Sequence, residues 1–132
     1  MQKLEGYDDL ALLVGRLFYS SLFWLYGYFK LTGYAGTVAY MTKQGLPVPA
    51  LFAVLAIIFE LGGGILMLVG YQTRMVALGL AVYVVVAALI AHMHWADGNQ
   101  MSHFFKNMGI VGGSLAFFVA GAGAYSLDRR KA

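Results

Sequence analysis

One acidic residue, Glu60, lies near the middle of an apolar run that extends from about Ala50 to Val69. About 20 apolar residues at ~1.5 Å per residue match the ~30 Å hydrocarbon core of a bilayer, so the run predicts a membrane-spanning helix. An ionisable group at mid-membrane is costly and normally faces the protein interior with a partner. We therefore expect Glu60 to be either a functional group or a paired packing residue. The glycines Gly62–Gly64 should let a second helix approach closely.

The whole chain has the composition of an integral membrane protein. Of its 132 residues, 61% are hydrophobic and 11% are charged, against about 45–50% and about 25% in ordinary soluble domains. No linker-like or low-complexity segment divides the sequence, so residues 1–132 are predicted to form a single domain. The net charge of +3 is too small, and the basic residues too scattered, to indicate a nucleic-acid partner.

Apolar periodicity predicts four membrane spans, at about residues 10–29, 50–69, 75–95 and 104–122. In the first loop, Thr37 to Gln44 can form a short helix on the membrane surface. The predicted fold class is therefore an all-α membrane protein, a four-transmembrane-helix bundle with a short interfacial helix in the first outer loop.

The basic residues predict the orientation of this bundle. Four spans put both termini on one side, which collects five basic residues: Lys3, Arg74, Arg129, Arg130 and Lys131. The other side holds three: Lys30, Lys43 and Lys106. The positive-inside rule then predicts a multi-pass protein of the bacterial inner membrane with both termini cytoplasmic.

A basic residue in the first span is the candidate partner for Glu60. At ~1.5 Å per residue, Arg16 lies ~9 Å and Glu60 ~15 Å from the cytoplasmic ends of their spans. An arginine side chain can reach across the ~6 Å difference in depth. We therefore predict an Arg16–Glu60 ion pair, because one buried charge left without its partner costs roughly 3–5 kcal/mol.

Other polar side chains gather toward the outer end of the predicted spans: Lys30, His92, His94, His103, Lys106 and Asn107. They predict a polar pocket that opens outward, with Glu60 at its floor. His92 can exchange protons near neutral pH, so Glu60 and His92 are the candidate catalytic residues. The candidate ligand-binding residues are Arg16, Lys30, Lys106 and Asn107. The competing interpretation is that Lys30 extends to the interface and that His94 and His103 are surface residues.

Such a pocket fits a quinone or a similar lipophilic carbonyl compound, with Phe23, Trp24 and Tyr26 as apolar walls. These aromatic residues could equally be lipid-facing or core residues. The sequence contains no cysteine, which excludes a thiolate site on this chain, so a partner or cofactor would carry electrons. A metal site from His92 or His94 with His103 and Asp97 matches no standard ligand spacing, and neither metal nor haem is expected.

Short motifs along nearly the whole chain resemble the DoxX family of small bacterial membrane proteins. They are Gly15-Arg16, Gly27-x-x-Lys30-Leu31-Thr32-Gly33, Ala35-Gly36-Thr37, Gly45-Leu46-Pro47, Glu60-Leu61-x-Gly63-Gly64, Gly70-x-x-Thr73-Arg74, His92, Lys106-Asn107 and Gly121-x-Gly123-x-Tyr125-Ser126-Leu127-Asp128-Arg129. Ala122 departs from the family pattern, which often has proline there. The resemblance implies a four-helix inner-membrane protein, similar to oxidoreductase components of thiosulfate:quinone oxidoreduction or of oxidative-stress complexes.

The leading hypothesis is an inner-membrane oxidoreductase component that binds a quinone or similar lipophilic molecule and works with a redox protein partner. The alternative is a non-enzymatic membrane scaffold or assembly factor, in which the polar residues serve packing. A small transporter or proton pathway is a third hypothesis, although no inverted repeat is visible. A homo-oligomer is compatible with each of the three.

Overall fold

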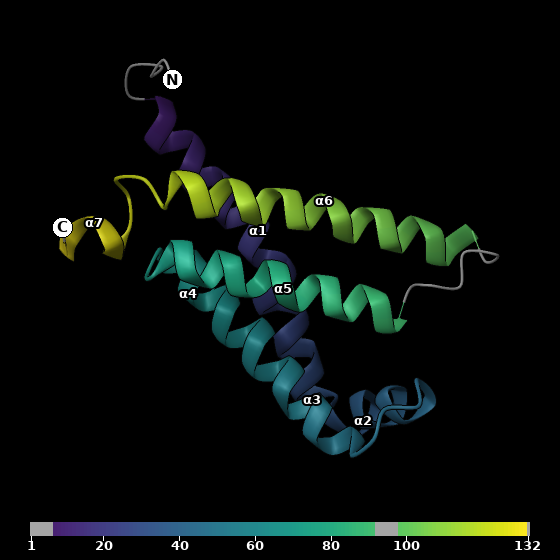
Figure 1. The fold of residues 1–132 in the computed structure, drawn as a ribbon. Helices are drawn as coiled ribbons and strands as arrows, with labels where there is room; N and C mark the ends of the chain where they lie inside the picture. The colour runs from purple at the N-terminus through teal and green to yellow at the C-terminus, as the bar shows by residue number, and fades with distance from the viewer. Residues whose placement is uncertain (1–6, 92–97, 132) are drawn as a thin grey trace.

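The structure is a computed structural model that describes residues 7–91 and 98–131, and within these ranges every regular element is a helix. The elements are α1 (Tyr7–Thr32), α2 (Tyr34–Lys43), α3 (Pro49–Ile57), η1 (Ile58–Gly62), α4 (Gly63–Val69), α5 (Thr73–Ala91), α6 (Gly98–Ala120) and α7 (Leu127–Lys131). Helices α3, η1 and α4 follow one another without a break. Both termini lie at one end of the molecule and α2 lies at the other (Figure 1).

The first helix, α1, has charged residues at both ends that stabilise it. Asp8 and Asp9 lie in the first turn of α1 and Lys30 in the last. Acidic groups near a helix N-terminus and basic groups near its C-terminus interact favourably with the helix dipole. At ~1.5 Å per residue, a helix of this length reaches ~39 Å, long enough to cross a bilayer.

Two glycines allow α1 to cross η1 and α4 at close range. A Cβ atom on Gly27 would lie 2.5 Å from the Leu61 backbone nitrogen, and one on Gly64 would lie 2.4 Å from the Trp24 nitrogen. Only glycine permits such an approach of two backbones. The prediction that the glycines after Glu60 serve close helix packing is therefore confirmed at Gly64.

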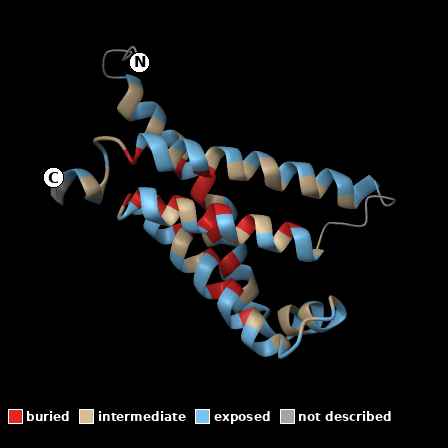
Figure 2. Ribbon diagram, in the orientation of Figure 1, coloured by how far each residue is buried: buried red, intermediate tan, exposed pale blue. Residues whose placement is uncertain are grey.

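The remaining long helices, α5 and α6, lie side by side as an antiparallel pair (Figure 1). Tyr19 of α1 joins this pair to the first half of the chain, because its hydroxyl shares a hydrogen bond with Ser114 of α6. Its ring also lies 5.3 Å from that of Phe117, between centroids. Buried residues gather where α1, α4 and α5 meet (Figure 2): Tyr19, Phe23, Met67, Ala77, Leu80 and Val84.

Within the described residues, three helical stretches are long and apolar enough to cross a membrane: α1, the continuous stretch Pro49–Val69, and α5. Many large apolar side chains on their outer surfaces are exposed, as lipid-facing residues would be. Three of the four predicted spans are thus supported. Helix α6 has 23 residues but is not among these three, and it begins at Gly98, six residues before the predicted boundary.

Candidate functional site

Glu60 lies in a short π-helical segment, η1, between two α-helical segments. A π-helix is wider than an α-helix and is found frequently at functional sites, where it changes the direction of a side chain. The Glu60 side chain is 9% exposed, so its charge needs partners within the protein.

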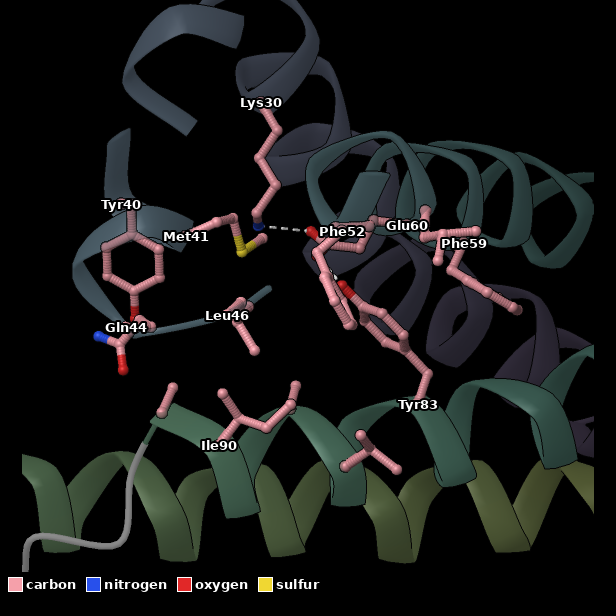
Figure 3. Close-up of a pocket in the computed structure, with 15 residues that line it drawn as sticks. Lys30, Tyr40, Met41, Gln44, Leu46, Phe52, Phe59, Glu60, Tyr83 and Ile90 are labelled. Carbon is pink, nitrogen blue, oxygen red and sulfur yellow. Dashed lines mark hydrogen bonds and ion pairs between the residues drawn. The ribbon is translucent and has the colours of Figure 1, made fainter. Parts of the chain in front are cut away.

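Two side chains from other helices bind the Glu60 carboxylate, one at each oxygen. Lys30, in the last turn of α1, places its Nζ 2.8 Å from Oε1. Tyr83 of α5 donates its hydroxyl hydrogen to Oε2. Figure 3 shows the three side chains converging from three different helices. We call Lys30, Glu60 and Tyr83 the polar triad.

The polar triad lies at one end of a pocket of about 320 Å³. Tyr40 and Gln44, from α2 and the turn after it, line the opposite side (Figure 3). The walls between are mostly apolar and come from α3, η1 and α5, with a turn residue: Leu46, Phe52, Leu55, Phe59, Val86, Ala87 and Ile90. A small polar group on large apolar walls is the usual composition of a small-molecule site.

An aromatic contact orients the tyrosine of the triad. The rings of Phe59 and Tyr83 are stacked, with centroids 5.5 Å apart and an angle of 23° between their planes. Because Phe59 precedes Glu60 in the same segment, η1 holds both the acceptor and the aromatic neighbour of Tyr83.

The predicted Arg16–Glu60 ion pair is wrong. Arg16 is fully buried at the other end of the molecule, near the termini. Its Nε donates to Ala122 O at 3.2 Å, and Nη1 donates to Met67 O at 3.1 Å and to Leu68 O at 2.9 Å. Nη2 donates to Tyr125 O. The guanidinium thus binds the last carbonyls of α4 and the segment after α6, and Arg16 does not line the pocket.

The direction of helical side chains explains this error. A Cα–Cβ bond tilts toward the N-terminus of its own helix. Because α1 and the α3–α4 stretch run in opposite directions, Arg16 points toward the termini and Glu60 points toward α2. Lys30 is farther along α1 and tilts back toward Glu60, so lysine is the partner that the geometry selects.

The other predicted site residues are distributed as follows. Lys30 and Glu60 line the pocket together, whereas Lys106 and Asn107 lie on α6 and do not. His92, His94 and Asp97 lie outside the described residues. The predicted aromatic walls are wrong for this pocket: Phe23 is in the core, Tyr26 lines a different hollow, and Trp24 lines neither.

Sequence reasoning missed Tyr83, although a signal was present. Tyr83 is the one residue with a polar group between Ala77 and Ala91, an otherwise apolar segment. A buried tyrosine hydroxyl normally needs a hydrogen-bond partner, and Glu60 is the acid of the neighbouring span. No group of three metal-binding side chains occurs within residues 7–91 and 98–131, and the metal candidates His92, His94 and Asp97 lie outside these ranges.

A second polar network lies at the end of the molecule that holds Arg16, where Asp128 binds the start of α5. Asp128 accepts hydrogen bonds from the backbone nitrogens of Gln72 at 2.7 Å and Thr73 at 2.9 Å, and so caps the start of α5. Partial burial alone would raise the pKa of the Asp128 carboxyl. The hydrogen bonds from Thr73 and Gln72 and the charge of Arg16 outweigh burial, so this pKa lies below its ordinary value.

Comparison with known proteins places this architecture in a family. The DoxX family model matches residues 11–93. The chain belongs to the DoxX family. The matched region contains the whole polar triad and Arg16, and it ends before Lys106 and Asn107. The predicted family is therefore confirmed, and the site lies within the part of the chain that defines it.

Two relatives from Escherichia coli strain K12 match almost end to end. Inner membrane protein YqjF is 42% identical over 129 residues, which cover 98% of this chain and 95% of the relative. Inner membrane protein YphA is 38% identical over 126 residues, covering 92% and 90%. No solved structure matches the chain significantly. The names of these two relatives agree with the predicted inner-membrane location.

Proposed function

We propose that this DoxX-family protein resides in the bacterial inner membrane and binds a quinone, or a similar lipophilic small molecule, in the pocket that ends at the polar triad. The observation that supports this most strongly is the buried Glu60 carboxylate, held by Lys30 and Tyr83 at one end of an otherwise apolar pocket. Its volume of about 320 Å³ is at the lower end of the usual range, roughly 300–1,000 Å³, so a compact ring fits better than a large ligand.

The chemistry of the triad suits both redox forms of such a ring. The Lys30 ammonium and the Tyr83 hydroxyl are donors that a quinone carbonyl can accept. The Glu60 carboxylate is an acceptor for a quinol hydroxyl. Since the sequence contains no cysteine, electrons would come from a redox partner protein, and the chain would act as an oxidoreductase component.

Glu60 and His92 remain the proposed proton-exchanging residues. Ala91, the residue before His92 in the sequence, ends α5 and lines the pocket. Lys106 and Asn107 do not line the pocket, so we do not propose that they contact the ligand. We propose that Arg16 stabilises the packing of the helices.

The proposed topology has four spans, with α6 as the fourth. Packing of α6 against α5 would compensate for its lower apolarity, because one face is then covered by protein. Helix α2 would lie at the outer membrane surface, since it buries no residue fully and stands at the end opposite the termini (Figure 1). Both termini would then be cytoplasmic.

Titration of the purified protein with a short-chain quinone tests the proposal. We expect saturable binding, with affinity at least about tenfold weaker in Glu60→Gln and Lys30→Met, because each variant removes a charged hydrogen-bonding group. The matched control is Lys43→Met, which removes one lysine from the exposed end of α2. Absence of saturable binding, or equal affinities in all variants, would contradict the proposal.

A scaffold role is the second candidate, favoured by two α6 glycines. A Cβ atom on Gly109 or Gly112 would meet nothing within 4 Å, and both residues are exposed. A helix of another protein could therefore approach α6 closely. Co-purification of one partner that is lost in Gly109→Leu but retained in Glu60→Gln would support this candidate over the first.

A further inference from the structure

A second hollow, of about 510 Å³, lies at the end of the molecule that holds the termini, away from the polar triad. It opens between the start of α5 and the segment that follows α6, which are neighbours at that end (Figure 1). Four charged residues line it: Asp9, Arg74, Asp128 and Arg129. We call it the terminal hollow.

Both acidic residues of the terminal hollow are already engaged by backbone donors. Asp128 accepts the two amide hydrogens at the start of α5. Asp9 accepts the amide hydrogen of Ala124 at 2.9 Å. Within the described part of the chain, neither carboxylate forms an ion pair with Arg74 or Arg129.

Within the described residues, both arginines of the terminal hollow are unpaired. The side chains of Arg74 and Arg129 are exposed, and neither guanidinium has a hydrogen bond or an ion pair within the described residues. Arg16 lies behind the lining and binds carbonyl oxygens only, Ala122 O and Tyr125 O among them. The lining thus holds two guanidinium groups and two carboxylates, and within the described residues only the carboxylates are hydrogen-bonded, which leaves the two guanidinium groups open to a ligand.

The buried hydroxyl of Thr73 belongs with the Asp128 carboxylate. Thr73 lines the terminal hollow and is fully buried, and its backbone nitrogen donates to Asp128. Its side chain also helps to lower the pKa of Asp128. The guanidinium groups of Arg74 and Arg129 are therefore the donors left for a ligand.

We infer that the terminal hollow binds a phosphate group, supplied by an anionic phospholipid. Guanidinium groups match phosphate oxygens in bidentate geometry, and unpaired arginines are the residues most suited to this contact. Lipid is favoured over free phosphate because the terminal hollow lies where α5, a helix long and apolar enough to cross a membrane, begins. In the proposed topology, this end of the molecule would lie at the level of lipid headgroups.

The test uses the full chain in neutral detergent, with phosphatidylglycerol, phosphatidylcholine or inorganic phosphate added separately. Retained lipid is measured by native mass spectrometry, and the shift of Tm is measured in parallel. The test variant is Arg74→Gln with Arg129→Gln. The control is Lys43→Gln with Lys106→Gln, which removes the same charge from exposed residues that do not line the terminal hollow.

We expect the wild type and the control to retain phosphatidylglycerol in preference to phosphatidylcholine. In the arginine variant, we expect its apparent affinity to fall about tenfold or more, since each surface basic group contributes about 1 kcal/mol to anionic-lipid binding. Equal loss in the control variant would overturn the inference, because it would show attraction by net charge alone. A Tm shift with inorganic phosphate as large as that with phosphatidylglycerol would overturn the lipid as the source.

Discussion

Arg16 and Glu60 are both buried charges, yet they are stabilised in opposite ways. Arg16 donates to four backbone carbonyls and does not line the pocket of the polar triad. Glu60 accepts from two side chains and faces a hollow of about 320 Å³. Backbone partners are fixed by the fold, whereas side-chain partners can exchange with a ligand. The comparison indicates that Arg16 holds the structure together and that Glu60 is available for binding.

Replacing Arg16 should have the largest effect. Arg16→Met removes the guanidinium hydrogen bonds to the carbonyls of Met67, Leu68, Ala122 and Tyr125. We expect a loss of at least about 3 kcal/mol in unfolding free energy. Thermal unfolding in detergent measures it. Arg74→Met, at an exposed position, should stay within about 0.5 kcal/mol. Similar unfolding free energies of Arg16→Met and Arg74→Met would contradict the stabilising role assigned to Arg16.

Replacing Glu60 should affect stability less and binding more. Glu60→Gln keeps the size of the side chain and an oxygen that accepts from Tyr83, while Lys30, whose side chain is 31% exposed, can turn toward water. We expect a loss of about 1–2 kcal/mol in unfolding free energy. Thermal unfolding should be measured on the samples used for quinone titration. A greater loss of stability than in Arg16→Met would reverse the roles assigned to the two charges.

Removing the tyrosine hydroxyl should sharpen the comparison further. Tyr83→Phe keeps the ring stacked on Phe59 and removes one hydrogen bond to Glu60, so we expect a loss of roughly 0.5–1.5 kcal/mol in unfolding free energy. Tyr28→Phe is the control, because Tyr28 is exposed and makes no hydroxyl hydrogen bond within the described residues. Equal quinone affinities of Tyr83→Phe and the wild type would remove Tyr83 from the proposed site.

The smallest expected effect is the pH dependence of stability that arises from Asp128, which lies at the same end of the molecule as Arg16. The pKa of Asp128 is lower in the folded protein than its ordinary value of 3.8. Its contribution to stability is therefore complete above pH 3.8 and is lost as the pH falls through the folded-state pKa. Unfolding measured between pH 5 and pH 3 should show a small loss of Tm in the wild type that is reduced in Asp128→Asn. Identical pH profiles would contradict this role.

Much of the architecture follows from apolar periodicity and glycine positions. The runs at 10–29 and 50–69, and the described part of the run at 75–95, correspond to helices within a few residues, because long apolar segments have few alternatives to a helix in a membrane. The site was predictable only in part. Counting residues gave the depth of Arg16 and Glu60 but not the direction of their side chains. It also assumed a regular α-helix through 58–62, where the chain is π-helical.

The π-helical segment has a consequence for how this chain can vary in length. In an α-helix, each residue advances the side-chain direction by ~100°, so one additional residue in a wide turn rotates everything beyond it relative to everything before it. Deleting a single residue from 58–62 would change the phase between α3, which lines the pocket, and α4, whose last carbonyls hold Arg16. The two ends of the molecule are therefore aligned by one turn, and an insertion or deletion there would disturb both at once.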